Sequence, residues 1–77
     1  MNVIIEQQSP PNPSWEVINV DLPENATVED AQAIVDDLNI YWATPDGERM
    51  LVWASKITNK DVTAPNFRIL VDGEVVA

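Results

Sequence analysis

The sequence predicts a small α+β domain, in which an antiparallel sheet of about four to six strands is covered on one face by a single helix, in the order β-β-α-β-β-β. Three observations predict this class: short alternating apolar runs toward both ends, one apolar stripe of helical period between them, and an Asp-Gly dipeptide flanked by apolar runs. Residues 1–77 are expected to form one domain, because a chain of 77 residues has no room for a second core. With no Cys in the chain, packing must stabilise the domain without disulfides.

Two strands are expected before the helix. Residues 2–8 contain a Val-Ile-Ile run and end at Ser-Pro-Pro-Asn-Pro, where three prolines withhold backbone donors and enforce an extended connector. Residues 15–22 alternate, with Ile18 and Leu22 on one face and Asn19 on the other. This alternation is typical of a strand that has one face in the core.

A helix is expected from about Val28 to Leu38. Its apolar residues recur at the i, i+3, i+4 and i+7 positions of one helix face, namely Ala31, Ile34, Val35 and Leu38. Thr27 is a good N-cap, and Asn39 can adopt the left-handed conformation that ends a helix.

A hairpin is expected after the helix. Residues 40–44 and 49–55 are rich in aromatic and branched side chains and flank Pro-Asp-Gly-Glu, in which Pro favours the start of a type I turn. Strand alternation would place Val52 and Trp53 on opposite faces of this hairpin. The polar residues 56–66 are expected to form a loop with at most one helical turn.

A second hairpin is expected at the C-terminal end. Residues 67–71 and 74–77 flank Asp72 and Gly73. Asp-Gly between apolar runs is the strongest short hairpin signal in the chain.

Residues 17–37 comprise a strand, a Pro-Glu-Asn-Ala-Thr connection and an acidic amphipathic helix. They resemble the second strand and the helix of the β-grasp, ubiquitin-like fold. The resemblance covers about a quarter of the chain and implies the fold alone. Prolines replace the tight first hairpin of that fold, and no Gly-Gly tail follows Val76 and Ala77, so conjugation is not implied.

Most catalytic chemistry is excluded by composition. The chain has no His and no Cys, and hence no imidazole base, no thiol nucleophile and no ordinary zinc site. The two Asp-Gly-Glu sequences fit turns better than Ca²⁺ loops. Carboxylate-only chemistry stays formally open, but it needs a cleft that a domain of this size rarely builds. We therefore predict a protein that is not an enzyme and that binds no cofactor or metal.

Negative charge is concentrated in the first part of the chain. The net charge is −9, and the first basic residue is Arg49. Ten carboxylates precede it: Glu6, Glu16, Asp21, Glu24, Glu29, Asp30, Asp36, Asp37, Asp46 and Glu48. Nucleic acids and anionic lipid surfaces repel such a protein, because Lys and Arg drive binding to both. We expect no direct contact with nucleic acid or membrane, and a protein partner with a basic surface.

The chain carries no recognisable targeting segment. No apolar run approaches the about 20 residues of a membrane span, and the N-terminus lacks the basic and apolar regions of a signal peptide. A soluble cytoplasmic protein is therefore expected, acting in the host cytoplasm if a phage encodes it.

The amount of charge is compatible with imitation of DNA. Compact-chain scaling predicts a radius of gyration of roughly 11 to 12 Å and a globule about 30 Å across. Duplex DNA of that length carries roughly 18 phosphates, about half of them facing one partner. In size and charge the chain resembles the DNA-mimic inhibitors that many phages encode against host or defence proteins.

The expected function is therefore that of a non-enzymatic acidic module that blocks a cationic nucleic-acid-binding protein. The end of the predicted helix supports this, because Asp36 and Asp37 would lie against the negative end of its dipole without a basic partner. The expected contact residues are Glu24, Glu29, Asp30, Asp36, Asp37, Asp46, Glu48, Trp42 and Trp53.

Two other interpretations stay open. A structural or assembly subunit could oligomerise, as a homodimer for example, through an open sheet face or the edge strand at Val75 and Val76. Trp42 and Trp53 are expected on neighbouring strands, and the single helix covers one sheet face only, so that a tryptophan on the other face would anchor a partner. In the third interpretation the charge serves solubility alone.

Overall fold

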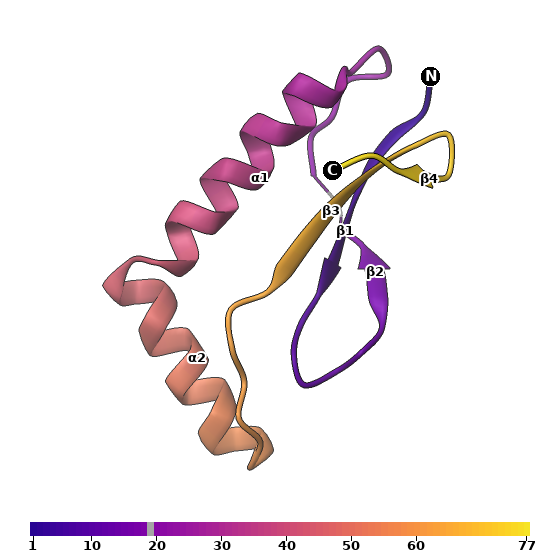
Figure 1. Cartoon of the computed structure of the whole chain (residues 1–77). Coiled ribbons are helices and arrows are strands. Elements are labelled where there is room, and N and C mark those ends of the chain that lie inside the picture. The colour runs from indigo at the N-terminus through magenta and orange to yellow at the C-terminus, as the bar shows by residue number, and fades with distance from the viewer. Residues whose placement is uncertain (19) are drawn as a thin grey trace.

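The computed structural model describes residues 1–18 and 20–77. The elements in chain order are β1 (Val3–Gln8), β2 (Trp15–Val17), α1 (Val28–Trp42), α2 (Pro45–Thr58), β3 (Asn66–Val71) and β4 (Glu74–Val75). The strands form one antiparallel sheet in the order β2-β1-β3-β4 (Figure 1). The small α+β class with a four-stranded antiparallel sheet is confirmed. The predictions of a single helix and of the order β-β-α-β-β-β are wrong, because two helices separate β2 from β3 and only two strands follow them in the described residues. The β-grasp resemblance is not confirmed.

The core lies between α1 and the two central strands. Ile5 on β1 is paired with Ile69 on β3, and each is only 1% exposed. Ala31 and Val35 of α1 are buried against them, at the helical spacing that the sequence predicts. Figure 1 shows α1 lying across this face of the sheet.

The second strand is shorter than expected. β2 ends at Val17, although the Ile18 amide still donates to the Ile5 carbonyl at 3.0 Å. Asn19, which the sequence places within this strand, lies outside the described residues. Ile18 and Leu22 nevertheless pack against the core, so the predicted apolar face is correct even where the ladder stops.

Helix α1 begins where the sequence predicts and ends later. The Thr27 side chain accepts from the Asp30 amide at 3.2 Å, and the Asp30 carboxylate accepts from the Thr27 amide at 2.9 Å, which together make a capping box. Asn39 does not end the helix, which continues to Trp42 and has Ala43 as its C-cap. An isolated Asn is a weak stop signal, because no Gly or Pro accompanies it.

We predict that Thr27→Ala lowers the free energy of unfolding by about 1 kcal/mol. The change removes one acceptor for the first helical turn and leaves the Asp30 side of the capping box in place. Urea unfolding followed by circular dichroism measures the effect. Thr27→Ser is the control, because it keeps a hydroxyl acceptor and should stay within about 0.5 kcal/mol of the parent. Equal losses in the two variants would contradict the cap.

The predicted hairpin at 40–55 is wrong, because this segment is helical. α1 takes its first residues, and α2 occupies Pro45–Thr58. The Thr44 hydroxyl accepts from the Gly47 amide at 3.2 Å, and Pro45 stands at the first helical position, where its missing N–H costs nothing. Asn59 ends α2 in the left-handed conformation at φ 55°. Helix caps at both ends therefore outweigh the strand propensity of the aromatic and branched residues between them.

The C-terminal hairpin is confirmed. β3 and β4 are joined by Asp72 at φ 49° and Gly73 at φ 85°, the two positive values of a type I′ turn. The Asp72 carboxylate also accepts from the Asn2 amide at 2.8 Å, which ties the N-terminus to this turn. The expected loop at 56–66 is shorter than predicted, because α2 extends to Thr58.

The molecule is more elongated than a compact globule. Its radius of gyration is 13.6 Å and its longest extent is 40 Å, against the 11 to 12 Å and about 30 Å expected from length alone. Helix α2 lies at one end of this long axis, beyond α1 and the central strands (Figure 1). Consequently α1 has sheet beneath it, whereas much of α2 has none.

Candidate protein-binding surfaces

The outer face of α1 carries three of the predicted carboxylates. Ala31 and Val35 face the sheet, and at 100° per residue Glu29, Asp36 and Asp37 lie on the opposite side. All three are exposed. We name Glu29, Asp36 and Asp37 the acidic face.

No basic side chain in the described part of the chain pairs with the acidic face. The two ion pairs among the described residues are Arg49 with Asp46 and Arg68 with Glu6, and neither involves this face. Asp36 accepts one hydrogen bond, from the side-chain Nε2 of Gln32 at 2.9 Å, and this neutral donor leaves the carboxylate charge uncompensated. The charge of the acidic face is therefore directed to solvent or to a partner.

Asp36 and Asp37 are not at the C-terminal end of α1. Because α1 continues to Trp42, Asp36 and Asp37 lie before its last turn, and the unfavourable effect of the helix dipole falls off within that turn. The expectation that they oppose the dipole is wrong. What distinguishes the acidic face as a candidate binding surface is only that its carboxylates have no basic partner among the described residues.

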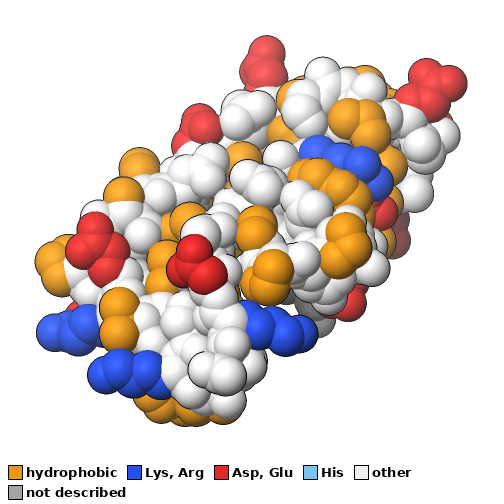
Figure 2. All heavy atoms as spheres, turned by 60° about the horizontal axis from the view of Figure 1, so that its bottom comes forward, with side chains coloured by type: hydrophobic (Ala, Val, Ile, Leu, Met, Phe, Trp, Pro, Cys, Tyr) orange, Lys and Arg blue, Asp and Glu red, His pale blue; other side chains and the backbone are white. Residues whose placement is uncertain are grey.

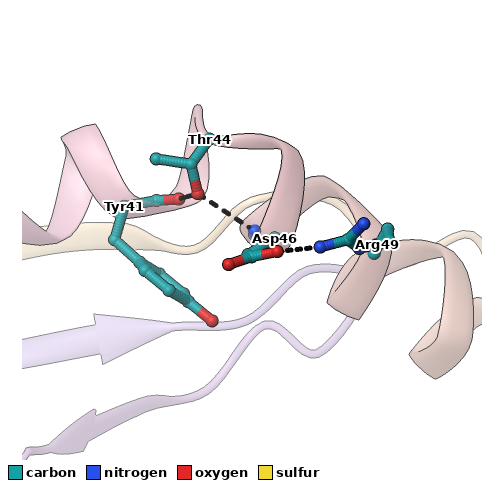
Figure 3. Close-up of polar contacts among 5 residues, drawn as sticks. Tyr41, Thr44, Asp46 and Arg49 are labelled. Atoms are coloured by element: carbon teal, nitrogen blue, oxygen red, sulfur yellow. Dashed lines mark hydrogen bonds and ion pairs between the residues drawn. The ribbon is translucent and has the colours of Figure 1, made fainter.

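The other predicted carboxylates are dispersed. Glu24 is exposed in the turn before α1, and Asp30 is used in the capping box. Asp46 and Glu48 lie in the first turn of α2, where they complement the helix dipole. Asp46 also forms an ion pair with Arg49. This pair lies beside the N-cap of α2, where the Thr44 hydroxyl accepts from the Gly47 backbone amide (Figure 3). The negative charge of Asp46 is therefore partly balanced by the neighbouring Arg49.

Trp42 and Trp53 lie on different helices instead of neighbouring strands. Trp42 ends α1, is half-buried and meets Tyr41 edge-to-face, with ring centroids 5.2 Å apart. Trp53 lies on α2 and is 59% exposed. Both line a cavity of about 160 Å³ next to α2, together with Met50 and Leu51. The structure therefore brings the two tryptophans together, and it leaves Trp53 available to a partner.

Trp15 belongs to a cluster that the sequence does not reveal. On the sheet face opposite α1, the Arg68 Nε donates to a Glu6 carboxylate oxygen at 2.7 Å, and the guanidinium carbon lies 4.3 Å from the centroid of the Trp15 ring. The three side chains meet through the pairing of β1 with β2 and β3. Their contact depends on strand register, so only a correct register could have predicted it. On this part of the open face, the charges of Glu6 and Arg68 and the ring of Trp15 therefore have partners within the chain.

Helix α2 exposes most of its apolar side chains. Met50, Val52, Trp53 and Ile57 are 46%, 55%, 59% and 63% exposed, whereas Gly47 is the helix's one buried residue. A groove of about 510 Å³ runs along it, lined by Pro45, Glu48, Arg49, Val52, Trp53 and Lys56. Figure 2 shows Lys and Arg side chains next to hydrophobic ones at one end of the molecule. The exposed apolar side chains of α2, next to Arg49 and Lys56, form a second candidate surface that differs in character from the acidic face.

Among the described residues, no group of three carboxylates is placed to hold a metal ion. Neither described helix is long and apolar enough to cross a membrane. Comparisons with protein-family models, with curated proteins and with solved structures give no match for this chain.

Proposed function

We propose that the protein is a non-enzymatic binding module that occupies the cationic nucleic-acid-binding surface of another protein, in the manner of a DNA mimic. One observation carries the proposal: residues 1–44 contain eight carboxylates and no basic residue, and the acidic face of α1 forms no ion pair with the described residues. In size and charge the chain resembles the DNA-mimic inhibitors that many phages encode against host or defence proteins.

The spacing of the carboxylates along α1 supports attraction to a row of Lys and Arg side chains on a partner protein. Glu29 and Asp36 are seven residues apart, or about 10.5 Å along the helix axis. About three phosphates of one DNA strand occupy the same length. The acidic face has three carboxylates in this length, so its charge density is about that of one DNA strand and about half that of the duplex. Glu24 and Asp30 lie near its N-terminal end. Such a surface steers association strongly at low salt.

A pull-down from bacterial lysate tests this function. The tagged protein is the bait, and the wash is raised to about 0.5 M salt, where the Debye length falls to a few Å. The expected result is a nucleic-acid-binding protein that both salt and competing DNA release. A bait with Asp36→Lys and Asp37→Lys should lose it, whereas Trp53→Ala should retain it. Capture that persists through salt, or that survives the charge reversal, would contradict the proposal.

Assembly through the sheet has less support. Both edge strands are short, three residues in β2 and two in β4, which is a common way in which proteins prevent pairing between sheets. The open face also carries the Glu6–Arg68 pair. Any self-association is better placed on α2, where the apolar side chains are exposed.

A further inference from the structure

Helix α2 has an outer stripe, which comprises the residues lining its groove: Pro45, Glu48, Arg49, Val52, Trp53 and Lys56. They follow the i, i+3, i+4, i+7, i+8, i+11 spacing of one helix side and run from the first turn to the last. We propose that this stripe is the interface between two copies of the chain, which pair through antiparallel α2 helices about a two-fold axis at Val52. The inference does not rest on the function proposed above.

The centre of the stripe has the composition of an interface anchor. Val52 and Trp53 are 55% and 59% exposed and adjacent, and Arg49 lies one turn before Trp53. Single exposed apolar residues are ordinary on protein surfaces, but Trp and Arg together are the residues most enriched where partners bind. With Val52 on the axis, Trp53 lies about 3 Å along the helix from Arg49 of the second copy, within reach of a cation–π contact.

The two ends of α2 carry opposite net charges. Because Arg49 is already paired with Asp46, Glu48 supplies the net charge near the first turn. Lys56 supplies that of the last turn. Glu48 lies four residues before Val52 and Lys56 four residues after it. A two-fold axis through Val52 therefore places Glu48 of each copy at the height of Lys56 of the other. A parallel pair would instead set like charges side by side. The stripe is thus complementary to itself in the antiparallel orientation.

The balance of charge along the chain identifies a second copy as the occupant. Two chains of net charge −9 repel each other, and the repulsion is strongest where residues 1–44 contribute eight carboxylates and no base. The segment 45–62 contains three acids and three bases and is neutral. The outer stripe lies in this neutral segment, at one end of the 40 Å long axis. Pairing there keeps most of the negative charge of the two copies apart.

The size of the stripe sets the expected strength. A helix of 14 residues is about 21 Å long, so one helix face provides less than the about 800 Å² per partner of a standard interface. We expect a dissociation constant of roughly 10 to 100 μM. At about 1 mM protein the mass should approach 17.2 kDa, twice the chain mass of 8.6 kDa, and at about 1 μM it should return to 8.6 kDa.

Crosslinking tests the axis, because the chain has no cysteine of its own. Under mild oxidation Val52→Cys should form a disulfide-linked dimer, since two thiols at a two-fold axis meet the short Cβ–Cβ distance of a disulfide. Val75→Cys is the matched control, an equally exposed valine on the edge strand β4. It should stay monomeric on the same timescale. Equal crosslinking at the two positions, or crosslinking at Val75 alone, would overturn the proposal.

A charge exchange tests the orientation. In sedimentation equilibrium Lys56→Glu should weaken the dimer at least about tenfold, because it meets Glu48 of the second copy. Glu48→Lys combined with Lys56→Glu should restore the parental affinity, since the pairs are exchanged between copies. Circular dichroism confirms that each variant is folded. A parent that stays monomeric at about 1 mM, or a dimer unchanged by Lys56→Glu, would overturn the antiparallel α2 pairing.

Discussion

Ile5→Ala is expected to lower the free energy of unfolding by about 2 to 5 kcal/mol. Ile5 is 1% exposed and packs between β3 and α1, so the substitution removes buried apolar surface and leaves a cavity. Few core side chains are buried to this degree, because the domain is small. A loss of this size is comparable with the whole stability of a domain near the lower limit.

Urea unfolding at 25 °C measures this loss, and Ile40→Ala is the matched control. Ile40 lies on α1 and is 65% exposed, so its truncation should change the free energy of unfolding by less than about 0.5 kcal/mol. Similar losses in the two variants would contradict the position of the core between α1 and the sheet.

Gly47→Ala is expected to destabilise the protein by about 1 to 3 kcal/mol, against the usual preference of helices for Ala. Gly47 is the buried residue of α2, and a Cβ there would lie 2.8 Å from the Trp42 Cα and still closer to the Tyr41 carbonyl oxygen. Both neighbours are backbone atoms of α1 and cannot rotate away. The added methyl must therefore push α2 away from the end of α1.

The sign of the Gly47→Ala effect is the test. In an isolated helix the same change stabilises by up to about 1 kcal/mol, so increased stability would show that α1 and α2 are not in this close contact. Gly73→Asn is the control, because Gly73 has positive φ with free space around it, and Asn accepts that conformation. Chemical unfolding curves for the two variants make the comparison direct.

The parts of the fold that the sequence predicts correctly are those with local signals. The Thr27 cap fixes the start of α1, and Asp72 with Gly73 fixes the last hairpin. The apolar period also places the core residues of α1 correctly, along with the acidic face opposite them. Each of these depends on a few neighbouring residues, so no knowledge of the tertiary structure is needed.

The sequence misleads where one segment suits two structures. Pro-Asp-Gly-Glu at residues 45–48 has the composition of a hairpin turn, and it is equally suited to the first turn of a helix after a Thr cap. Thr44 and Asn59 decide the outcome, because they satisfy backbone groups at both ends of α2. With strand alternation Val52 and Trp53 would face opposite sides, whereas the helix puts them on one stripe.

The candidate binding surfaces are therefore predictable in part. The acidic face follows from composition and helical period. The contact of Arg68 with Glu6 and Trp15 depends on strand register, and the outer stripe of α2 depends on the correct element type. The contact of Arg68 requires the strand register, whereas the outer stripe has helical spacing and becomes visible once α2 is assigned as a helix.

The central claim is that the acidic face, and not net charge alone, binds a basic partner. The direct measurement is the affinity of the captured partner for two triple variants, each of which changes the net charge from −9 to −6. The first carries Glu29→Gln, Asp36→Asn and Asp37→Asn. The control carries Glu16→Gln, Asp21→Asn and Asp61→Asn, which neutralise exposed carboxylates elsewhere.

We expect the first variant to lose at least about tenfold in affinity at low salt, with a weaker dependence on salt, and the control to stay within about threefold of the parent. Equal losses in the two variants would contradict a localised site, because the partner would then sense only the total charge.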